Sequence, residues 1–99
     1  PEQPMVGDWI VTVYENNEQK GQGAFTFTEE GTYRMSKLID YQRGRYAWVS
    51  GKLMIRADGH ELEAWAVDWD GNHRFTTIAG EQTFVFDRYG TLKMETNNG

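Results

Sequence analysis

Apolar and polar side chains alternate with a period of two residues along almost the whole chain. In the segment 5–14, Trp9 and Val11 fall on one side of an extended backbone, while Asp8 and Thr12 fall on the other. This is the period of a β-strand, in which successive side chains point to opposite faces. Almost no segment shows the 3.6-residue period of a helix, so the sequence predicts an all-β fold.

Glycine-containing turn signals divide the alternating segments at short intervals. Asp-Gly and Ser-Gly pairs are typical of β-hairpins, because glycine adopts a positive φ without cost. The polar stretch ENNEQKGQG, residues 15–23, predicts a loop or a frayed connection. The predicted strands are 5–14, 24–28, 32–39, 45–49, 52–56, 62–69 and 75–79, followed by a last hairpin in which Phe84 and Phe86 pair across a turn near Tyr89-Gly90 with Leu92 and Met94.

This series of about eight to nine short strands favours a small antiparallel up-and-down β-barrel, and a small β-sandwich is the alternative. A length of 99 residues suits a single domain spanning 1–99 and is too short for two ordinary ones. Closure into a barrel also removes the exposed strand edges through which such chains aggregate.

The composition excludes several functional classes. The chain has no cysteine, so it can form no disulfide, thiolate nucleophile or cysteine-based metal site. No apolar run approaches the roughly 20 residues of a membrane helix. The opening PEQP shows no signal-peptide pattern and is typical of a processed start, an artificial end or a linker remnant. The net charge of −5 argues against general nucleic-acid binding.

Charge is distributed unevenly along the chain. Residues 1–31 carry six acidic side chains and one basic, whereas residues 32–57 carry six basic side chains and one acidic, and residues 58–99 carry eight acidic and three basic. This pattern indicates a basic face between two acidic ones. We expect its basic residues to pair across strands with the acidic neighbours.

Three stretches resemble a known family. Gly7-Asp8-Trp9 looks like the G-x-W signature of the lipocalin and fatty-acid-binding group, and FTFTEEGTY and GRYAWVSGKLMI are similar to strand-turn patterns of small bacterial lipocalin-like domains. The resemblance covers most of the chain from Gly7 to about Arg88. It implies a closed barrel that holds a hydrophobic or amphipathic small molecule, in a protein of the periplasm or the extracellular space; a cytoplasmic location stays open.

In that family the tryptophan closes the floor of the barrel, and a basic side chain from a late strand packs across its ring. The resemblance therefore implies a structural plug made of Gly7, Trp9 and Arg88, with Arg74 or Lys93 as alternatives for the basic residue. The chain is much shorter than full-length lipocalins and lacks their long terminal helix. Shorter strands enclose less space, so a deep ligand cavity is not implied.

Catalytic chemistry finds little support in the sequence. His60 lies near Glu61 and Glu63, but two weak ligands at strand spacing do not make a metal site, and His73 follows a predicted turn. The stretch DWDGN, residues 68–72, lacks the distal glutamate of a calcium loop and fits a turn better. We therefore expect no enzyme activity, no cofactor and no metal.

Binding is better supported, because small barrels hold ligands between apolar walls and one or two polar anchors. The predicted ligand-binding residues are Tyr33, Met35, Tyr46, Trp48, Trp65, Trp69, Arg34 and Arg45. The alternative is that these rings simply fill the core. Strand parity adds a constraint, since Arg45 and Trp48 cannot both point inward without a bulge.

Two functions follow from these observations. The first is a non-enzymatic barrel that binds a hydrophobic or amphipathic small molecule. The second is a protein-interaction module, an inhibitor or assembly partner, that uses an exposed aromatic or basic face. Neither includes nucleic acid as a partner or a membrane-spanning segment, and the sequence does not give the oligomeric state.

Overall fold

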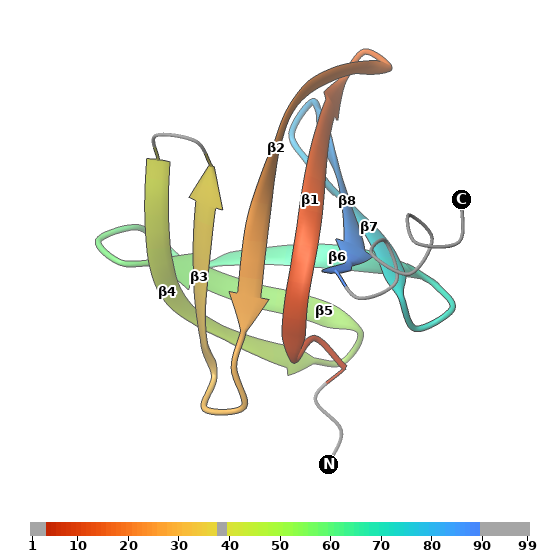
Figure 1. The fold of residues 1–99 in the computed structure, drawn as a ribbon. Helices are drawn as coiled ribbons and strands as arrows, with labels where there is room; N and C mark the ends of the chain where they lie inside the picture. Colours follow the sequence, from red (N-terminus) through yellow and green to blue (C-terminus); the bar gives the residue numbers. More distant parts are fainter. Residues whose placement is uncertain (1–3, 38–39, 90–99) are drawn as a thin grey trace.

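The fold consists of eight β-strands joined by short connections. The computed structural model describes residues 4–37 and 40–89. Figure 1 shows the strands in chain order, and they span β1 Gly7–Glu15, β2 Glu18–Phe27, β3 Thr32–Lys37, β4 Asp40–Val49, β5 Lys52–Ala57, β6 Glu63–Asp70, β7 Arg74–Ala79 and β8 Gln82–Arg88. Within the described residues, no helix has the length and apolar character needed to cross a membrane.

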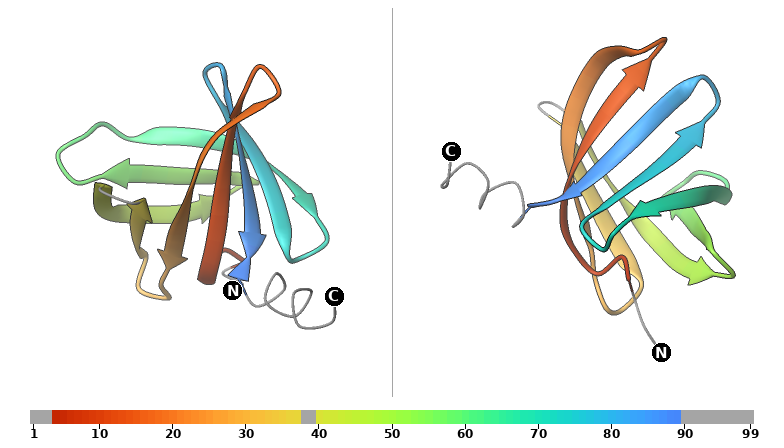
Figure 2. Two further views of the ribbon diagram at one scale, coloured as in Figure 1. Left: turned by 45° about the horizontal axis from the view of Figure 1, so that its top comes forward. Right: turned by 90° about the vertical axis from the view of Figure 1, so that its right-hand side faces the viewer.

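The eight strands form one closed antiparallel barrel. Each strand pairs with the next in sequence, and β1 also pairs with β8, so that Trp9 lies opposite Phe25 on one side and Arg88 on the other. The two views in Figure 2 show the ribbon curling round until its first and last strands lie side by side. The predicted up-and-down barrel is therefore confirmed, and the alternative β-sandwich is not formed.

The prediction of a loop over residues 15–23 is wrong. The connection between β1 and β2 consists only of Asn16 and Asn17, which adopt φ values of 54° and 65°. Asparagine tolerates this left-handed region and forms two-residue hairpin turns. Strand β2 therefore begins at Glu18, and its first residues resemble a loop in the sequence because their side chains are polar and exposed.

The predicted last hairpin also differs from the structure. Phe84 and Phe86 pair with Val13 and Val11 on β1, and β8 pairs along its other edge with β7. Both edges of β8 are thus paired with strands other than the expected one. The expected partners Leu92 and Met94, like Ile39 of the predicted third strand, lie outside the described residues.

Strand β4 is strongly curved (Figure 1), and it pairs with β3 over residues 40–45 and with β5 over residues 44–49. Gly44 lies opposite both Tyr33 and Ala57. A Cβ atom at this position would collide with the backbone oxygen of Arg56 and lie 2.8 Å from the Cα of Ala57. Only glycine fits this close approach of two backbones.

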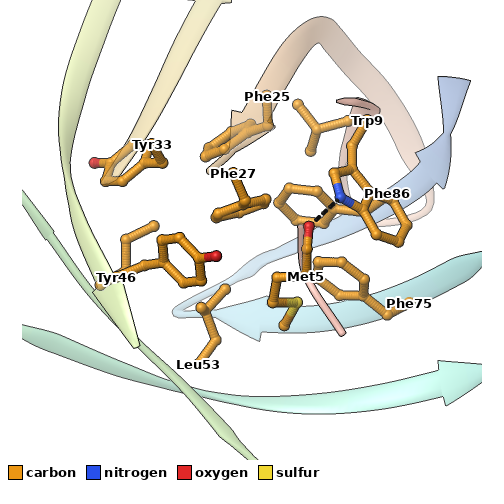
Figure 3. Close-up of a cluster of buried hydrophobic side chains, with 11 residues drawn as sticks. Met5, Trp9, Phe25, Phe27, Tyr33, Tyr46, Leu53, Phe75 and Phe86 are labelled. Carbon is orange, nitrogen blue, oxygen red and sulfur yellow. Dashed lines mark hydrogen bonds between the residues drawn. The ribbon is translucent and has the colours of Figure 1, made fainter. Parts of the chain in front are cut away.

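The core is made mainly of aromatic side chains that converge from alternate positions of the strands (Figure 3). Phe75 and Phe86 stack with ring centroids 4.4 Å apart, and Phe27 contacts Tyr46 edge-on at 4.8 Å. Such ring pairs add roughly 0.5–1.5 kcal/mol beyond the area they bury. The buried hydrophobic residues are Met5, Trp9, Val11, Phe25, Phe27, Tyr33, Tyr46, Leu53, Ile55, Phe75 and Phe86.

Candidate functional site

One end of the barrel is closed by Trp9 and by the segment that precedes β1. Trp9 is only 1% exposed, and its ring contacts Phe75 edge-on at 4.9 Å. Its indole Nε1 donates a hydrogen bond of 2.8 Å to the backbone oxygen of Met5, drawn as a dashed line in Figure 3. The side chain of Met5 is itself fully buried. Among the residues that the structure describes, these buried side chains fill this end of the barrel.

Arg88 packs over the Trp9 ring at the closed end and hydrogen-bonds to the segment that precedes β1. Its guanidinium carbon lies 4.1 Å from the centroid of the Trp9 ring, where a cation is attracted to the aromatic face. The same group donates hydrogen bonds to the backbone oxygens of Val6, Pro4 and Asn72 at 2.9, 3.1 and 3.1 Å. Burial lowers the pKa of Arg88, and the carbonyl contacts still favour its charged form.

Gly7 makes this contact sterically feasible. Its φ is +132°, and a Cβ atom there would lie 2.8 Å from Nη1 of Arg88. The glycine of the G-x-W pattern thus leaves room for the guanidinium, while the tryptophan supplies the ring beneath it. Of the two alternative basic residues, Arg74 instead forms an ion pair of 2.6 Å with Asp87, and Lys93 lies outside the described residues.

The opposite end of the barrel contains a cavity of about 290 Å³. Several of its lining residues, among them Val13, Lys20 and Gln82, lie near the β1–β2 and β7–β8 hairpins. Figure 1 shows these two hairpins at its top. Trp65 and Phe84 form part of its wall and contact each other edge-on at 5.5 Å. The lining residues are Val11, Val13, Lys20, Gly21, Gly23, Phe25, Met35, Gln42, Trp65, Gln82 and Phe84.

Two glycines of β2 account for the open space. Gly21 lies directly opposite Val13, and Gly23 directly opposite Val11, so both occupy inward-facing positions. A Cβ atom added at Gly21 would meet no other atom within 4 Å. Farther along the same face of β2, the phenylalanine rings begin and the barrel becomes filled. The absence of two side chains therefore leaves a cavity above the core.

Polar donors lie at the wall of this cavity. Lys20 and Gln82 both line the cavity. The ammonium group of Lys20 contacts Glu18 at 3.0 Å, and Gln82 donates a long hydrogen bond of 3.5 Å to Glu15. Gln42 accepts a hydrogen bond of 3.0 Å from the hydroxyl of Tyr33 through Oε1. Its amide nitrogen is therefore available to donate toward a ligand.

Tyr33 connects the filled core with the cavity. Its ring stacks on Phe25 with centroids 5.6 Å apart, and its hydroxyl reaches Gln42. Burial raises the pKa of Tyr33 to about 12, and the negative charges of Asp58 and Glu63 add to the effect. The phenol is consequently neutral near pH 7, and it holds the amide of Gln42 in one orientation.

The structure separates the predicted ligand-binding residues into three groups. Met35 and Trp65 line the cavity. Tyr33 and Tyr46 are buried in the core, while Trp48 and Trp69 pack against it and contact each other at 6.1 Å. Arg34 and Arg45 are exposed on the outer face of the barrel, in agreement with the strand parity of Arg45 and Trp48.

Sequence reasoning missed several residues of the cavity. The signal for Gly21 and Gly23 is their period-two spacing in GQGAFTF, which continues the inward-facing positions of Phe25 and Phe27. The polar residues around them predict a loop, and a loop gives neither glycine a face of the sheet. The three polar residues at the cavity wall were missed as well, since they follow no motif of their own.

The basic block forms a second feature, on the outer face of β3, β4 and β5. Arg34 lies directly opposite Arg43, and Arg45 directly opposite Arg56. We call these four residues the arginine cluster. The expectation that they pair across strands with acidic neighbours is wrong for Arg34, Arg45 and Arg56. Among the described residues, only Arg43 of the four has an acidic neighbour, Asp58, at 3.9 Å. The register of the two hairpins, fixed by the inward-facing rings, places arginine against arginine.

The remaining candidates for chemistry do not converge. His60 and His73 are exposed. In the part of the chain that the structure describes, no three histidine, aspartate or glutamate side chains come together as a metal site. Comparisons with protein-family models, with curated proteins and with solved structures found no match to this chain.

Proposed function

We propose that the protein is a non-enzymatic barrel that binds a hydrophobic or amphipathic small molecule in the cavity at its open end. The observation that carries this proposal is the cavity of about 290 Å³, whose apolar wall is interrupted by the donors of Lys20, Gln42 and Gln82. Ligand sites in proteins combine mostly apolar walls with a few fixed polar groups.

The dimensions and the polarity of the cavity limit the ligand. Its volume lies at the lower end of the range of about 300–1,000 Å³ for small-molecule sites, so a compact ring or a short acyl chain fits better than a large lipid. The polar residues that line it offer an ammonium and two amide groups as donors. We therefore expect a ligand with an apolar body and a carboxylate or carbonyl oxygen at one end.

The closed end supports membership of the lipocalin-like group as part of this proposal. Trp9 at the floor, Gly7 beside it and Arg88 across the indole ring reproduce the arrangement that the sequence resemblance implies. A barrel with a filled floor and an open upper end is suited to taking up a ligand from one side only.

Native mass spectrometry of gently purified protein, combined with organic extraction, tests the proposal. A small molecule that co-purifies, or a short-chain fatty acid that binds when added, is the expected result. Binding should also change the fluorescence of Trp65, which lies in the cavity wall. A mass of the protein alone, unchanged by fatty-acid or retinoid-like probes, would contradict the proposal.

A pair of variants on β2 localises the binding. Gly21→Leu fills the cavity, and we expect it to weaken ligand binding at least tenfold, which corresponds to about 1.4 kcal/mol. Ala24→Leu adds a larger side chain on the same strand at an exposed position. This control should bind the ligand as the original protein does. If both variants lost ligand affinity equally, the ligand would not bind in this cavity.

The second candidate function, a protein-interaction module, is favoured by a row of apolar side chains on the outer face of the barrel, all exposed except the half-buried Met54. Ala47, Met54 and Ala64 lie opposite one another on β4, β5 and β6, and Val49 extends the row with an exposed fraction of 51%. Apolar surface of this kind is typical of partner contacts. Light scattering of Val49→Glu against the original protein tests self-association; an unchanged mass at high concentration counts against a self-association role.

A further inference from the structure

The arginine cluster brings like charges together on the outside of the barrel. Arg43 and Arg45 are two positions apart on β4 and point to the same face, and each has another arginine directly across from it, Arg34 on β3 and Arg56 on β5. Side chains directly opposite in an antiparallel pair have Cβ atoms about 4.5–5.5 Å apart. Four arginine side chains thus originate next to one another on the outer face of three adjacent strands.

The described acidic residues do little to offset this charge. Only Arg43 approaches a carboxylate, with its Nε 3.9 Å from Asp58, and these side chains are 71% and 72% exposed. An exposed pair at that distance contributes little. Neither Arg34, Arg45 nor Arg56 forms an ion pair with any residue that the structure describes. Like charges directly opposite each other destabilise a sheet.

A shallow groove of about 310 Å³ lies at the cluster. Three of the four arginines line it together with threonine hydroxyls, and Asp58 is the one acidic residue among them. The lining residues are Thr28, Thr32, Tyr33, Arg34, Arg43, Gly44, Arg45 and Asp58. The groove therefore combines a concave surface with a local excess of positive charge, in a protein whose net charge is −5.

We propose that this groove is a binding site for a compact anion of the phosphate class, such as a phosphomonoester or a pyrophosphate group. Guanidinium groups offer N–H donors in a planar fork that matches phosphate oxygens. An anion with two or more charges would lie between Arg34, Arg43 and Arg45 and offset their mutual repulsion. The site is separate from the barrel cavity, because these side chains point outward.

The charge around the cluster favours a compact anion over a polymer. The sequence segments on both sides of the basic block each have a net charge of −5. A nucleic acid carries many phosphates, and a protein with a net charge of −5 repels such a polyanion as a whole. A small dianion stays within the reach of the arginines and avoids that repulsion.

Titration with pyrophosphate at low ionic strength tests the site. Binding is monitored through the backbone NMR resonances and through the temperature of thermal unfolding. Sodium chloride at matched ionic strength separates specific binding from screening. We expect pyrophosphate at low millimolar concentration to shift the resonances of β3 and β4 and to raise the unfolding temperature, whereas chloride does less. Equal effects of the two salts would overturn the proposal.

Two variants distinguish binding at the groove from a general attraction of anions to positively charged residues. The double variant Arg34→Gln/Arg45→Gln removes two donors, and we expect it to lose at least tenfold in pyrophosphate affinity. Without anion it should unfold at the same or a higher temperature, because repulsion is relieved. Lys52→Gln is the control, since it removes an exposed positive charge of β5 outside the groove. The single variant Arg34→Gln removes one charge, as the control does. If Lys52→Gln lowered the pyrophosphate affinity as much as Arg34→Gln, the proposal would be overturned.

Two further experiments show whether the phosphate group belongs to a lipid headgroup or to a soluble molecule. Vesicles of phosphatidylcholine containing phosphatidic acid present it as a lipid headgroup. Co-sedimentation that pyrophosphate competes away would assign a lipid source, and pyrophosphate binding without co-sedimentation would assign a soluble one; both support the anion site. A single-stranded oligonucleotide that binds more tightly than pyrophosphate, with equal loss in Lys52→Gln, would overturn the compact-anion proposal.

Discussion

The two ends of the barrel are built from the same strands but differ in the volume of the side chains that fill them. At the closed end, Trp9, Phe27, Phe75 and Phe86 are each no more than 1% exposed. At the open end, the inward positions of β2 are glycines and those of β1 are valines. The backbone ladder is continuous between the ends, so the cavity arises from side-chain volume and not from a break in the sheet.

This difference assigns stability to one end and binding to the other. Large rings that are fully desolvated contribute most of the favourable free energy of folding. Space left near glycines forfeits such contacts and therefore costs stability unless a ligand occupies it. Substitutions at the two ends should accordingly have different, and in one case opposite, effects.

Trp9→Ala should have the largest effect on stability. Removal of a fully buried indole that also donates a hydrogen bond to Met5 is expected to lower the free energy of unfolding by about 3–5 kcal/mol. Trp65→Ala at the partly exposed cavity wall should cost only about 1–2 kcal/mol. Urea unfolding followed by circular dichroism measures both. If Trp9→Ala lowered the free energy of unfolding by less than about 1 kcal/mol, the closed end would not be the main source of stability.

The same glycine-to-alanine substitution should have opposite signs at two positions. At Gly44 the added Cβ collides with the backbone of β5, and we expect a loss of about 2–3 kcal/mol. At Gly21 it enters open space, and the reduced freedom of the unfolded chain should yield a gain of about 0.4–1 kcal/mol. Thermal unfolding of both variants measures the contrast, and a loss at Gly21 would contradict the open cavity.

These glycines also show what the sequence alone could reveal. Alternation predicted the barrel and the inward side of most strands, because an apolar face must be buried for a β-sheet to fold. The space around Gly21 and Gly44 depends on how closely another strand approaches, and no local pattern encodes that distance. The arginine cluster was hidden for a similar reason: which residue lies opposite Arg34 or Arg45 depends on hairpin register.

Arg88→Ala should cost about 2 kcal/mol, because it removes a charged donor from three backbone oxygens and a cation from the face of Trp9. Arg88→Lys keeps the charge but loses the planar fork, so most of the loss should persist. Arg74→Ala is the control, and loss of its ion pair with Asp87 should cost no more than about 1 kcal/mol. If both arginines cost the same in chemical denaturation, Arg88 does not fasten the closed end.

Tyr33 provides the most delicate test, at the boundary between the filled and the open parts. Its pKa in the fold is raised to about 12, while that of an unfolded tyrosine is 10.0. Below pH 10 the phenol is protonated in both states and its full contribution is present. Between about pH 10 and pH 12 the unfolded state loses its proton first, so stability should fall as pH rises. Tyr33→Phe should flatten this decline in pH-dependent denaturation; an unchanged slope would mean that another group, such as Tyr46, whose pKa is also raised by burial, governs it.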